Sequence, residues 1–317
     1  MPMNPIILVI FRTAAQGFIL FAAGAFIPLL GQVVAVFTPV PFIVTALRHG
    51  VRESLAAFGI VALLITVLAG SQAGLILALG FGLMAAGIVI GMRRNLPPEK
   101  TVLLGGLLPV LAASIPLLMT AMHAENGLLA PAEAYMRKSL LEAVEIYKKA
   151  GLAEMAQAVS DVSDRFVYYF VRLLPGLAVT LSLVQSASCY GISRARLRRD
   201  PGRSATLPPQ TAFAAWHAPD AWVWGLIAAL ACVAAPQEVV RFTGMNFGIF
   251  FLCVYAAQGM AVVEFMLRKG GLHAAARSVV HALIVMLPSV MLLPPLGVVD
   301  IWADVRKVRK PTTSEPV

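Results

Sequence analysis

The stretch Ala73–Met92, AGLILALGFGLMAAGIVIGM, is twenty residues long and carries no charged side chain. An α-helix needs about 20 consecutive apolar residues to cross the hydrocarbon core of a bilayer. Gly80, Gly87 and Gly91 would let a neighbouring helix approach this one closely, and Gly87 with Gly91 forms a G-x-x-x-G pair. We therefore predict a membrane-spanning helix that packs inside a bundle.

Similar apolar runs recur on both sides of this stretch. Hydrophobic residues make up 59% of the chain and charged residues 13%, and the mean hydropathy is +0.82, which is outside the range of soluble domains. We predict an all-α fold, a polytopic transmembrane helical bundle of eight to nine membrane segments with short loops. The runs lie at about 14–30, 33–47, 55–68, 73–92, 102–122, 166–190, 222–235, 247–267 and 274–299.

Prolines in two of these runs bear on how the chain crosses the membrane. Pro39 and Pro41 divide the run 33–47, and we expect neighbouring helices to cover this break. Pro288 lies inside the run 274–299, where we expect a re-entrant hairpin. The reason is that nine crossings would place the basic C-terminal residues outside, against the usual charge asymmetry. The alternative is that two early runs form a single crossing.

Residues 123–164 break the apolar pattern with seven acidic and four basic side chains. Apolar residues recur at helical spacing within them, and Gly151 separates two such stripes. We predict a short insert of two amphipathic helices outside the hydrocarbon, which lie on the bilayer surface, cap the bundle or act as a plain connector. The first stripe consists of Met136, Leu140, Val144 and Tyr147, and the second of Leu152, Met155 and Val159.

Basic residues near the segment ends set the expected orientation, because cytoplasmic loops are enriched in Lys and Arg. With the N-terminus in the cytoplasm, thirteen of the 25 Lys and Arg residues fall in cytoplasmic loops and the acidic insert faces outward. The expected parts are N-terminal membrane segments at 1–122, the extramembrane insert at 123–164, C-terminal membrane segments at 165–305 and a basic tail at 306–317.

The motifs, cysteine spacing and charge distribution of the sequence disfavour several classes of protein. No phosphate-binding loop, serine-hydrolase elbow or zinc-protease motif is present, so we expect no enzyme and no cofactor. Cys189, Cys232 and Cys253 lie in apolar runs at no metal-like spacing, which predicts neither a disulfide framework nor a metal site. The net charge of +9 lies mainly in loops beside membrane segments, which favours lipid headgroups over nucleic acid as its partner.

Polar residues within or beside the apolar runs are the candidates for a ligand site, because an ionisable group in hydrocarbon is costly and usually marks a pathway or a pairing. Arg172 lies about two turns inside its run, where it either snorkels outward or faces a polar cavity. We predict an outward-facing pocket, with the alternative that each residue only satisfies backbone groups at helix ends. The pocket residues are Gln32, Gln72, Arg172, Glu238 and Asn246, with Arg241 nearby.

Glu264 is the second ionisable residue inside an apolar run. It precedes Arg268 by one helical turn, and an i,i+4 ion pair at the cytoplasmic rim explains it without a function. His273 and His281 are eight residues apart, a spacing that can place both on one helix face. They could then form a pair that takes up and releases protons, although interfacial or hydrogen-bonded histidines are commoner.

The most basic loop of the chain follows the run 166–190. We expect its arginines to contact lipid or a protein partner, which supports a second hypothesis: a non-catalytic membrane scaffold that recruits cytoplasmic or envelope proteins. The same residues would also orient the chain, so charge alone does not separate the two roles. The arginines concerned are Arg194, Arg196, Arg198 and Arg199.

Four regions of the chain carry a resemblance to a known family. They are PLLG at 28–31 with FTPVPF at 37–42 and RHG at 48–50, the Trp216 to Gly225 region, QGMAVV at 258–263 and LGVVDIWADVRK at 296–307. Over nearly its whole length the chain resembles the YybS-like family of uncharacterised bacterial membrane proteins. This resemblance implies the bacterial cytoplasmic (inner) membrane and brings no established activity with it.

The N-terminal half is more distantly similar to the substrate-binding components of energy-coupling-factor transporters. That similarity implies a bundle that captures a small molecule on its outer side and docks onto a coupling subunit and ATPases. The chain departs from that pattern: it is longer than the usual six helices, and Thr13 and Gly17 replace the alanines of the docking motif. Our leading hypothesis is therefore transport-related binding of a small molecule, with the scaffold as the alternative.

Overall fold

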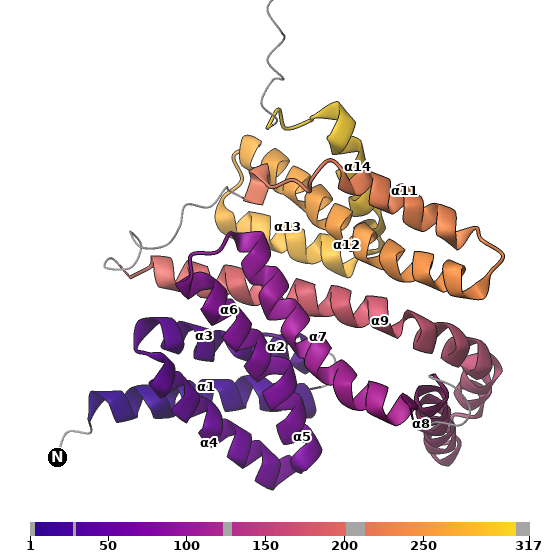
Figure 1. Ribbon diagram of the computed structural model, residues 1–317, viewed down its shortest axis with the longest axis horizontal. Helices are drawn as coiled ribbons and strands as arrows, with labels where there is room; N and C mark the ends of the chain where they lie inside the picture. Colours follow the sequence, from indigo (N-terminus) through magenta and orange to yellow (C-terminus); the bar gives the residue numbers. More distant parts are fainter. Residues whose placement is uncertain (1–3, 28–29, 123–128, 201–212, 309–317) are drawn as a thin grey trace, which may run out of the picture. The chain divides into compact units, whose positions relative to one another are not determined.

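The computed structural model describes residues 4–27, 30–122, 129–200 and 213–308, and every regular element in these ranges is helical (Figure 1). The predicted all-α polytopic bundle is confirmed. The parts of the expectations that lie outside the described residues are 28–29 of the first run, 123–128 of the insert, 309–317 of the tail, and Arg203, a further arginine of the most basic loop.

Seven helices in the described ranges are long and apolar enough to cross a membrane. The runs at 222–235 and 274–299, which we counted as crossings, form shorter helices instead, because Pro288 ends the second of them after the extended residue Leu287. The seven are α1 (Pro5–Phe26), α2 (Leu30–Ala35) with α3 (Pro39–Arg48), α4 (Val51–Ala69), α5 (Ser71–Ile76) continuing through a π-helical turn (Leu77–Gly82) into α6 (Leu83–Arg93), α7 (Pro98–Met122), α9 (Ala153–Arg198) and α12 (Glu238–Lys269). The shorter apolar helices are α11 (Trp222–Val233), α13 (Ala274–Met286) and α14 (Leu293–Ala303).

The helices form two compact units. The first comprises Met1–Val171 with Leu181–Pro208, and the second comprises Arg172–Thr180 with Pro209–Val317. α9 contributes to both units and runs without a break across residue 165, where the sequence placed the start of the C-terminal membrane segments.

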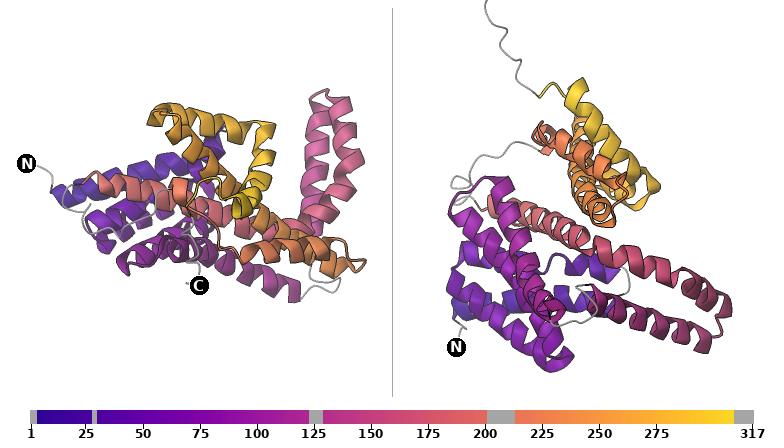
Figure 2. Two further views of the ribbon diagram at one scale, coloured as in Figure 1. Left: turned by 90° about the horizontal axis from the view of Figure 1, so that it is seen from above. Right: turned by 45° about the vertical axis from the view of Figure 1, so that its right-hand side comes forward.

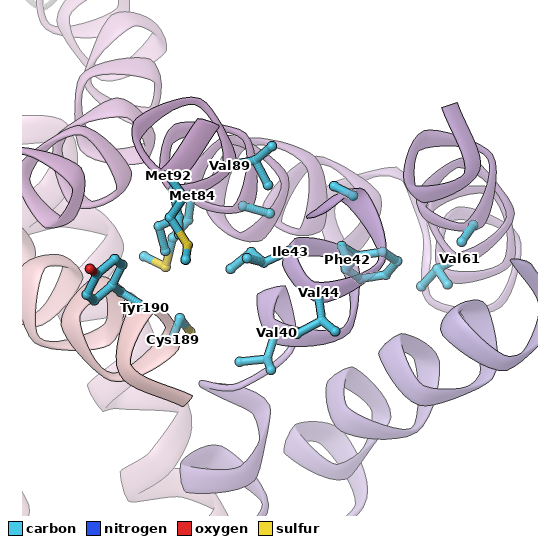
Figure 3. Close-up of a cluster of buried hydrophobic side chains, with 14 of the residues drawn as sticks. Val40, Phe42, Ile43, Val44, Val61, Met84, Val89, Met92, Cys189 and Tyr190 are labelled. Atoms are coloured by element: carbon cyan, nitrogen blue, oxygen red, sulfur yellow. The ribbon is translucent and has the colours of Figure 1, made fainter. Parts of the chain in front are cut away.

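The first unit is built around α3, whose residues from Pro39 to Ala46 are all buried. The hydroxyl of Thr38 donates to the carbonyl of Ala35 at 2.7 Å and closes the turn from α2 into α3. Figure 3 shows the α3 side chains facing those of neighbouring helices, among them Met84 and Met92. The expected break at the prolines is confirmed, and α1, α4 and α6 cover it.

The outer face of this unit is apolar. On α4 the side chains of Leu63, Val67 and Leu68 are 66%, 73% and 69% exposed. In water such a surface would cost about 25 cal/mol per Å² of apolar area, whereas lipid tails cover it without that cost. The exterior is therefore suited to a bilayer.

Small residues bring α6, α7 and α9 close together, as predicted for Gly87. A Cβ at Gly87 would lie 2.8 Å from the Cα of Gly105 on α7, so the two backbones nearly touch. Ser186 on α9 donates its hydroxyl to the carbonyl of Val102 on α7 at 2.9 Å. Gly80 makes no such contact, because in the described part of the chain no neighbouring atom lies within 4 Å of the position of its Cβ.

The insert consists of α8 (Ala130–Lys149) and the first turns of α9, which lie side by side in Figure 2. An ion pair joins Arg137 to Asp164 across them. The expectation of two short helices was wrong for the second one, because its sequence continues without a helix-ending residue into the apolar run that follows. The first stripe is confirmed, since Val144 is buried, while Met155 of the second stripe is exposed.

The second unit packs α11 and α14 against α12. Tyr255 of α12 is fully buried among Ala218, Val223, Leu226 and Ile301. The chain changes direction between α13 and α14 through a short 3-10 turn at Pro288–Leu292. The proline break that we expected in this run is therefore present.

Candidate functional site

Two of the five residues expected to line a ligand pocket form an ion pair in the second unit. The Nε of Arg172 on α9 lies 2.8 Å from Oε1 of Glu238 at the start of α12. The guanidinium carbon of Arg172 stands 5.7 Å from the centre of the Phe242 ring, a cation–π distance. The positive charge of Arg172 is thus compensated by the carboxylate of Glu238 and the ring face of Phe242.

Asn246 joins α12 to α9 by hydrogen bonds beside the Arg172–Glu238 ion pair. Its Nδ2 donates to the carbonyls of Arg172 and Phe242, each at 2.8 Å, and its Oδ1 accepts from the N–H of Gly176 at 2.6 Å. Arg172 and Gly176 are one helical turn apart, so the amide bridges a single turn of α9. A side chain at position 176 would overlap Asn246, which explains the glycine there.

Replacing Asn246 by leucine should destabilise the second unit by about 1–3 kcal/mol, because the N–H of Gly176 loses its partner in a partly buried contact. Tryptophan fluorescence during heating reports this unit, since all four tryptophans lie in it. Gln237→Leu, at an exposed amide before the same helix that makes no cap hydrogen bond, is the control and should change little. Equal effects of the two substitutions would contradict the bridging role.

The other two expected pocket residues belong to the first unit. Gln32 donates from Nε2 to the carbonyl of Gly24 at 2.7 Å and so ties α2 to α1. Gln72 is exposed in the first turn of α5. Neither side chain lines the two cavities described below.

The four arginines of the basic loop differ in their surroundings. Arg194 is 3% exposed and donates to the hydroxyl of Tyr190 at 3.2 Å, so it is not available at the surface for lipid or a partner. Arg196 and Arg198 are exposed on the last turn of α9, and Arg199 is exposed directly after it. Helical spacing explains why Arg194 is buried and the other three are exposed, because Arg194 shares a helix face with the buried Leu197.

Glu264 has more partners than the i,i+4 pair predicted from the sequence. Its side chain on α12 is 8% exposed, and Oε1 lies 2.6 Å from Nε of Arg268 and 3.2 Å from Nε of Arg277. Oε2 lies 3.7 Å from Nε2 of His281. One buried carboxylate is therefore held by two guanidinium groups and faces an imidazole, with α13 supplying Arg277 and His281.

A cavity of about 300 Å³ adjoins this carboxylate. The Nε2 of His281 is buried and has no hydrogen-bond partner among the described residues. His273 does not pair with His281; it caps α13 by accepting from the N–H of Ala276 at 3.0 Å. The cavity is lined by Phe213, Met260, Glu264, Ala274, Arg277, Ser278 and His281.

The family model described as Predicted membrane protein (DUF2232) matches residues 17–301. The chain belongs to this family. No curated protein and no solved structure matches the chain. The DUF2232 match runs from α1 into α14, so it includes both the Glu264 cavity and the Arg172 contacts.

Sequence reasoning missed a buried polar network in this DUF2232 protein. We counted Arg306 with the basic tail, but it is 3% exposed and its NH2 lies 2.7 Å from Oδ2 of Asp300. Gln258 on α12 donates to the same oxygen at 3.2 Å, and NH1 of Arg306 donates to the carbonyl of Trp216 at 2.8 Å. The signal was available, because these residues come from three of the regions that carried the family resemblance.

No group of three His, Cys, Asp or Glu side chains suited to a metal is found in the described part of this DUF2232 chain. The three cysteines are free thiols. Cys189 is fully buried, with its sulfur 3.4 Å from the carbonyl oxygen of Val36, and so acts as a small packing residue of the first unit.

Proposed function

We propose that this membrane protein binds a small zwitterionic solute in the Glu264 cavity and acts as the solute-binding part of a transport system. The supporting observation is a carboxylate, two arginines and a histidine gathered beside a cavity on a helix of membrane-spanning length. Charged clusters in such segments are costly and usually mark a pathway or a site. A cavity of about 300 Å³ suits a molecule of amino-acid size.

The chemistry of the cavity favours a solute with both charges. Oε2 of Glu264 can accept from a cationic group of the solute, because the two arginines approach the other oxygen. Arg277 uses Nε toward Glu264 and NH1 toward the carbonyl of Leu272, which leaves further N–H donors for an anionic group. His281 adds a nitrogen that either donates or accepts.

Transport by this chain would depend on other proteins. The sequence contains no nucleotide-binding motif, so ATP-driven uptake would require separate ATPase subunits, and we expect the chain itself not to be an enzyme. We propose that it lies in a bacterial cytoplasmic membrane with its N-terminus in the cytoplasm, as the YybS-like resemblance and the loop charges suggest. With this orientation Glu264 lies at the cytoplasmic rim, so capture on the outer side, which the similarity to energy-coupling-factor components implies, stays a prediction for the outer pocket.

The outer pocket drawn from Gln32, Gln72, Arg172, Glu238 and Asn246 stays a prediction. We prefer the Glu264 cavity because Arg172, Glu238 and Asn246 make strong contacts with their own chain. We propose that these three residues stabilise the contact between α9 and α12.

Filling the cavity tests the proposal. Ser278→Leu places a larger side chain in the lining, whereas Val279→Leu alters the next residue, whose side chain is 58% exposed. The probes are the twenty standard amino acids and glycine betaine. A ligand at 100 times its Kd stabilises the folded state by about 2.7 kcal/mol, which raises the Tm by a few degrees.

We expect at least one probe to raise the Tm of the unsubstituted protein and of Val279→Leu, but not of Ser278→Leu. The Tm is read from tryptophan fluorescence in detergent. If no probe shifts the Tm, or if Ser278→Leu keeps the shift, the proposed solute site is wrong.

One observation favours the scaffold alternative. α8 lies outside the candidate spans, yet its side chains Tyr135, Leu141 and Ile146 are 74%, 66% and 66% exposed. Apolar side chains on an exposed helix face suit a protein partner or the bilayer surface. A photocrosslinking amino acid at Ile146 should give protein adducts in cells if the scaffold alternative holds, and lipid adducts or none if it does not.

A further inference from the structure

A second polar cavity lies in the first unit, where α1, α3 and the end of α9 meet. Its volume is about 370 Å³. Its polar lining is dominated by positive charge, and the apolar side chains of Val9 and Val44 complete it. The arginines that line it are Arg12 from α1, Arg48 from α3, Arg196 from α9 and Arg199 directly after α9.

The charge of this cavity is only partly compensated. Among the described residues no acidic side chain lines it, and Oδ2 of Asp200 lies 2.6 Å from Nε of Arg48. Glu53 lies beside Gly50, outside the lining. The C-termini of α3 and α9 each offset about half a charge. About two positive charges of the lining therefore remain without an acidic partner among the described residues.

Several guanidinium N–H groups of the cavity also have no acceptor among the described residues. Arg48 is held in place, because NH2 donates to the carbonyl of Arg196 at 2.9 Å in addition to the bond with Asp200. Within the described ranges, the guanidinium groups of Arg12, Arg196 and Arg199 make no hydrogen bond or ion pair. Like charges held close together without an anion repel one another, so the arrangement is suited to an anionic ligand.

The floor of the cavity is preformed. The hydroxyls of Thr13 and Thr45 are 2.8 Å apart and join α1 to α3, and the two residues are 4% and 6% exposed. Both line the cavity, so a bound anion would meet a buried hydroxyl pair below and guanidinium groups around it. A site built on two hydrogen-bonded helices keeps its shape without the ligand.

We propose that this cavity binds a phosphate group. Guanidinium groups donate paired hydrogen bonds that match phosphate oxygens, and several around one cavity favour a doubly charged or diester phosphate over a carboxylate. The phosphate belongs either to the headgroup of an anionic phospholipid or to a soluble phosphate ester. Leu8 and Phe11 of α1, which are 54% and 56% exposed, would lie along the acyl chains of a lipid.

Orientation of the chain does not by itself explain this arrangement. Basic residues that only fix topology need to lie in loops on one side of the membrane, with no requirement that they meet. Here Arg12, Arg48 and Arg196 are distant in the sequence and line one cavity. From the sequence, only arginines near the end of α9 were candidates for contact with lipid or a partner, and Arg12 and Arg48 were not among them.

The test uses a reporter of the first unit. Cys189 is buried in that unit, whereas Cys232 and Cys253 lie in the second, so a thiol-reactive dye on the Cys232→Ser, Cys253→Ser protein reports when the first unit unfolds. Binding is followed as the rise in unfolding temperature with phosphatidylglycerol against phosphatidylcholine in micelles. A second series compares glycerol 3-phosphate with chloride at equal ionic strength.

The substitutions are Arg196→Gln with Arg199→Gln, and the control is Arg198→Gln, which removes the same charge from an exposed residue of the same helix end outside the lining. Each pocket arginine removed should weaken the apparent affinity about tenfold, because a charge-assisted hydrogen bond is lost. Arg198→Gln should change it less than about threefold, the effect of one screened surface charge. Arg12→Gln on α1 repeats the test if the α9 variants do not fold.

Stabilisation by phosphatidylglycerol alone supports the proposal with a lipid as the source, and stabilisation by glycerol 3-phosphate supports it with a soluble ester. The absence of both effects would overturn it. It would also be overturned if Arg198→Gln weakened binding as much as the pocket substitutions, because the effect would then be general surface charge.

Discussion

Replacing Arg306 by alanine should lower the free energy of unfolding of the second unit by about 3–5 kcal/mol, which is a large part of the stability of a typical domain. The side chains of Arg306 and Asp300 are 0% and 3% exposed. Removing the guanidinium leaves a buried carboxylate with Gln258 as its remaining hydrogen-bond donor among the described residues. A buried charge without its partner costs more than the pair itself contributes.

The loss would extend beyond the ion pair. NH1 of Arg306 donates to the carbonyls of Ala214 and Trp216, each at 2.8 Å, so the arginine holds the segment before α11. Gln258 also accepts from the N–H of Ala218 at 3.1 Å. Arg306→Ala therefore frees two carbonyls and weakens the attachment of this segment to α12 and α14.

The measurement is unfolding in mixed micelles followed by tryptophan fluorescence, in which Trp216 reports the network directly. Lys307→Gln is the matched control, because Lys307 is the adjacent basic residue and is exposed. The double substitution Asp300→Asn with Arg306→Met removes both charges and should recover part of the loss. An Arg306→Ala protein as stable as Lys307→Gln would contradict the role of the network.

The fold class was predictable because it depends on composition and run length, which the sequence states directly. Ala73–Met92 became a candidate span that ends in α6, and the break before Pro39 appeared where proline required it. The number of spanning helices was harder to predict from the sequence. The run 274–299 contains enough apolar residues for a crossing, but Leu287 is extended before Pro288 and the helix ends there.

The polar clusters were harder to predict, since they depend on which helices become neighbours. Glu264 was explained by Arg268 on its own helix, and Arg277 and His281 reach it only because α13 lies beside α12. Arg306 was assigned to a tail because local sequence does not show that the chain folds back onto α12. Periodicity describes one helix at a time, whereas both clusters join two or more elements.

Gly259→Ala should destabilise the second unit by about 2 kcal/mol or more, although alanine is the better helix former. In an exposed helix interior the same change would stabilise by up to about 1 kcal/mol. At Gly259 a Cβ would overlap the carbonyl oxygen of Leu293, the first residue of α14, so the helices must separate. Overpacking against a backbone atom costs about 1–3 kcal/mol and outweighs the gain in propensity.

The two helices meet through a reciprocal contact, which makes the effect larger than one overlap suggests. A Cβ at Gly297 of α14 would overlap the carbonyl oxygen of Tyr255, one turn before Gly259 on α12. Separation at Gly259 would therefore loosen the contact at Gly297 as well. The Gln258–Asp300 hydrogen bond of 3.2 Å, which lies beside both glycines in the sequence, would lengthen with it.

Gly248→Ala is the matched control on the same helix, because no neighbouring atom of the described residues lies within 4 Å of the position of its Cβ. We expect this substitution to leave the Tm unchanged or to raise it, while Gly259→Ala lowers it by several degrees in the same fluorescence measurement. If the two Gly→Ala substitutions change the Tm in opposite directions, contact with α14, and not helix propensity, requires glycine at position 259. If both variants became more stable, α12 and α14 would have to lie farther apart than in this structure.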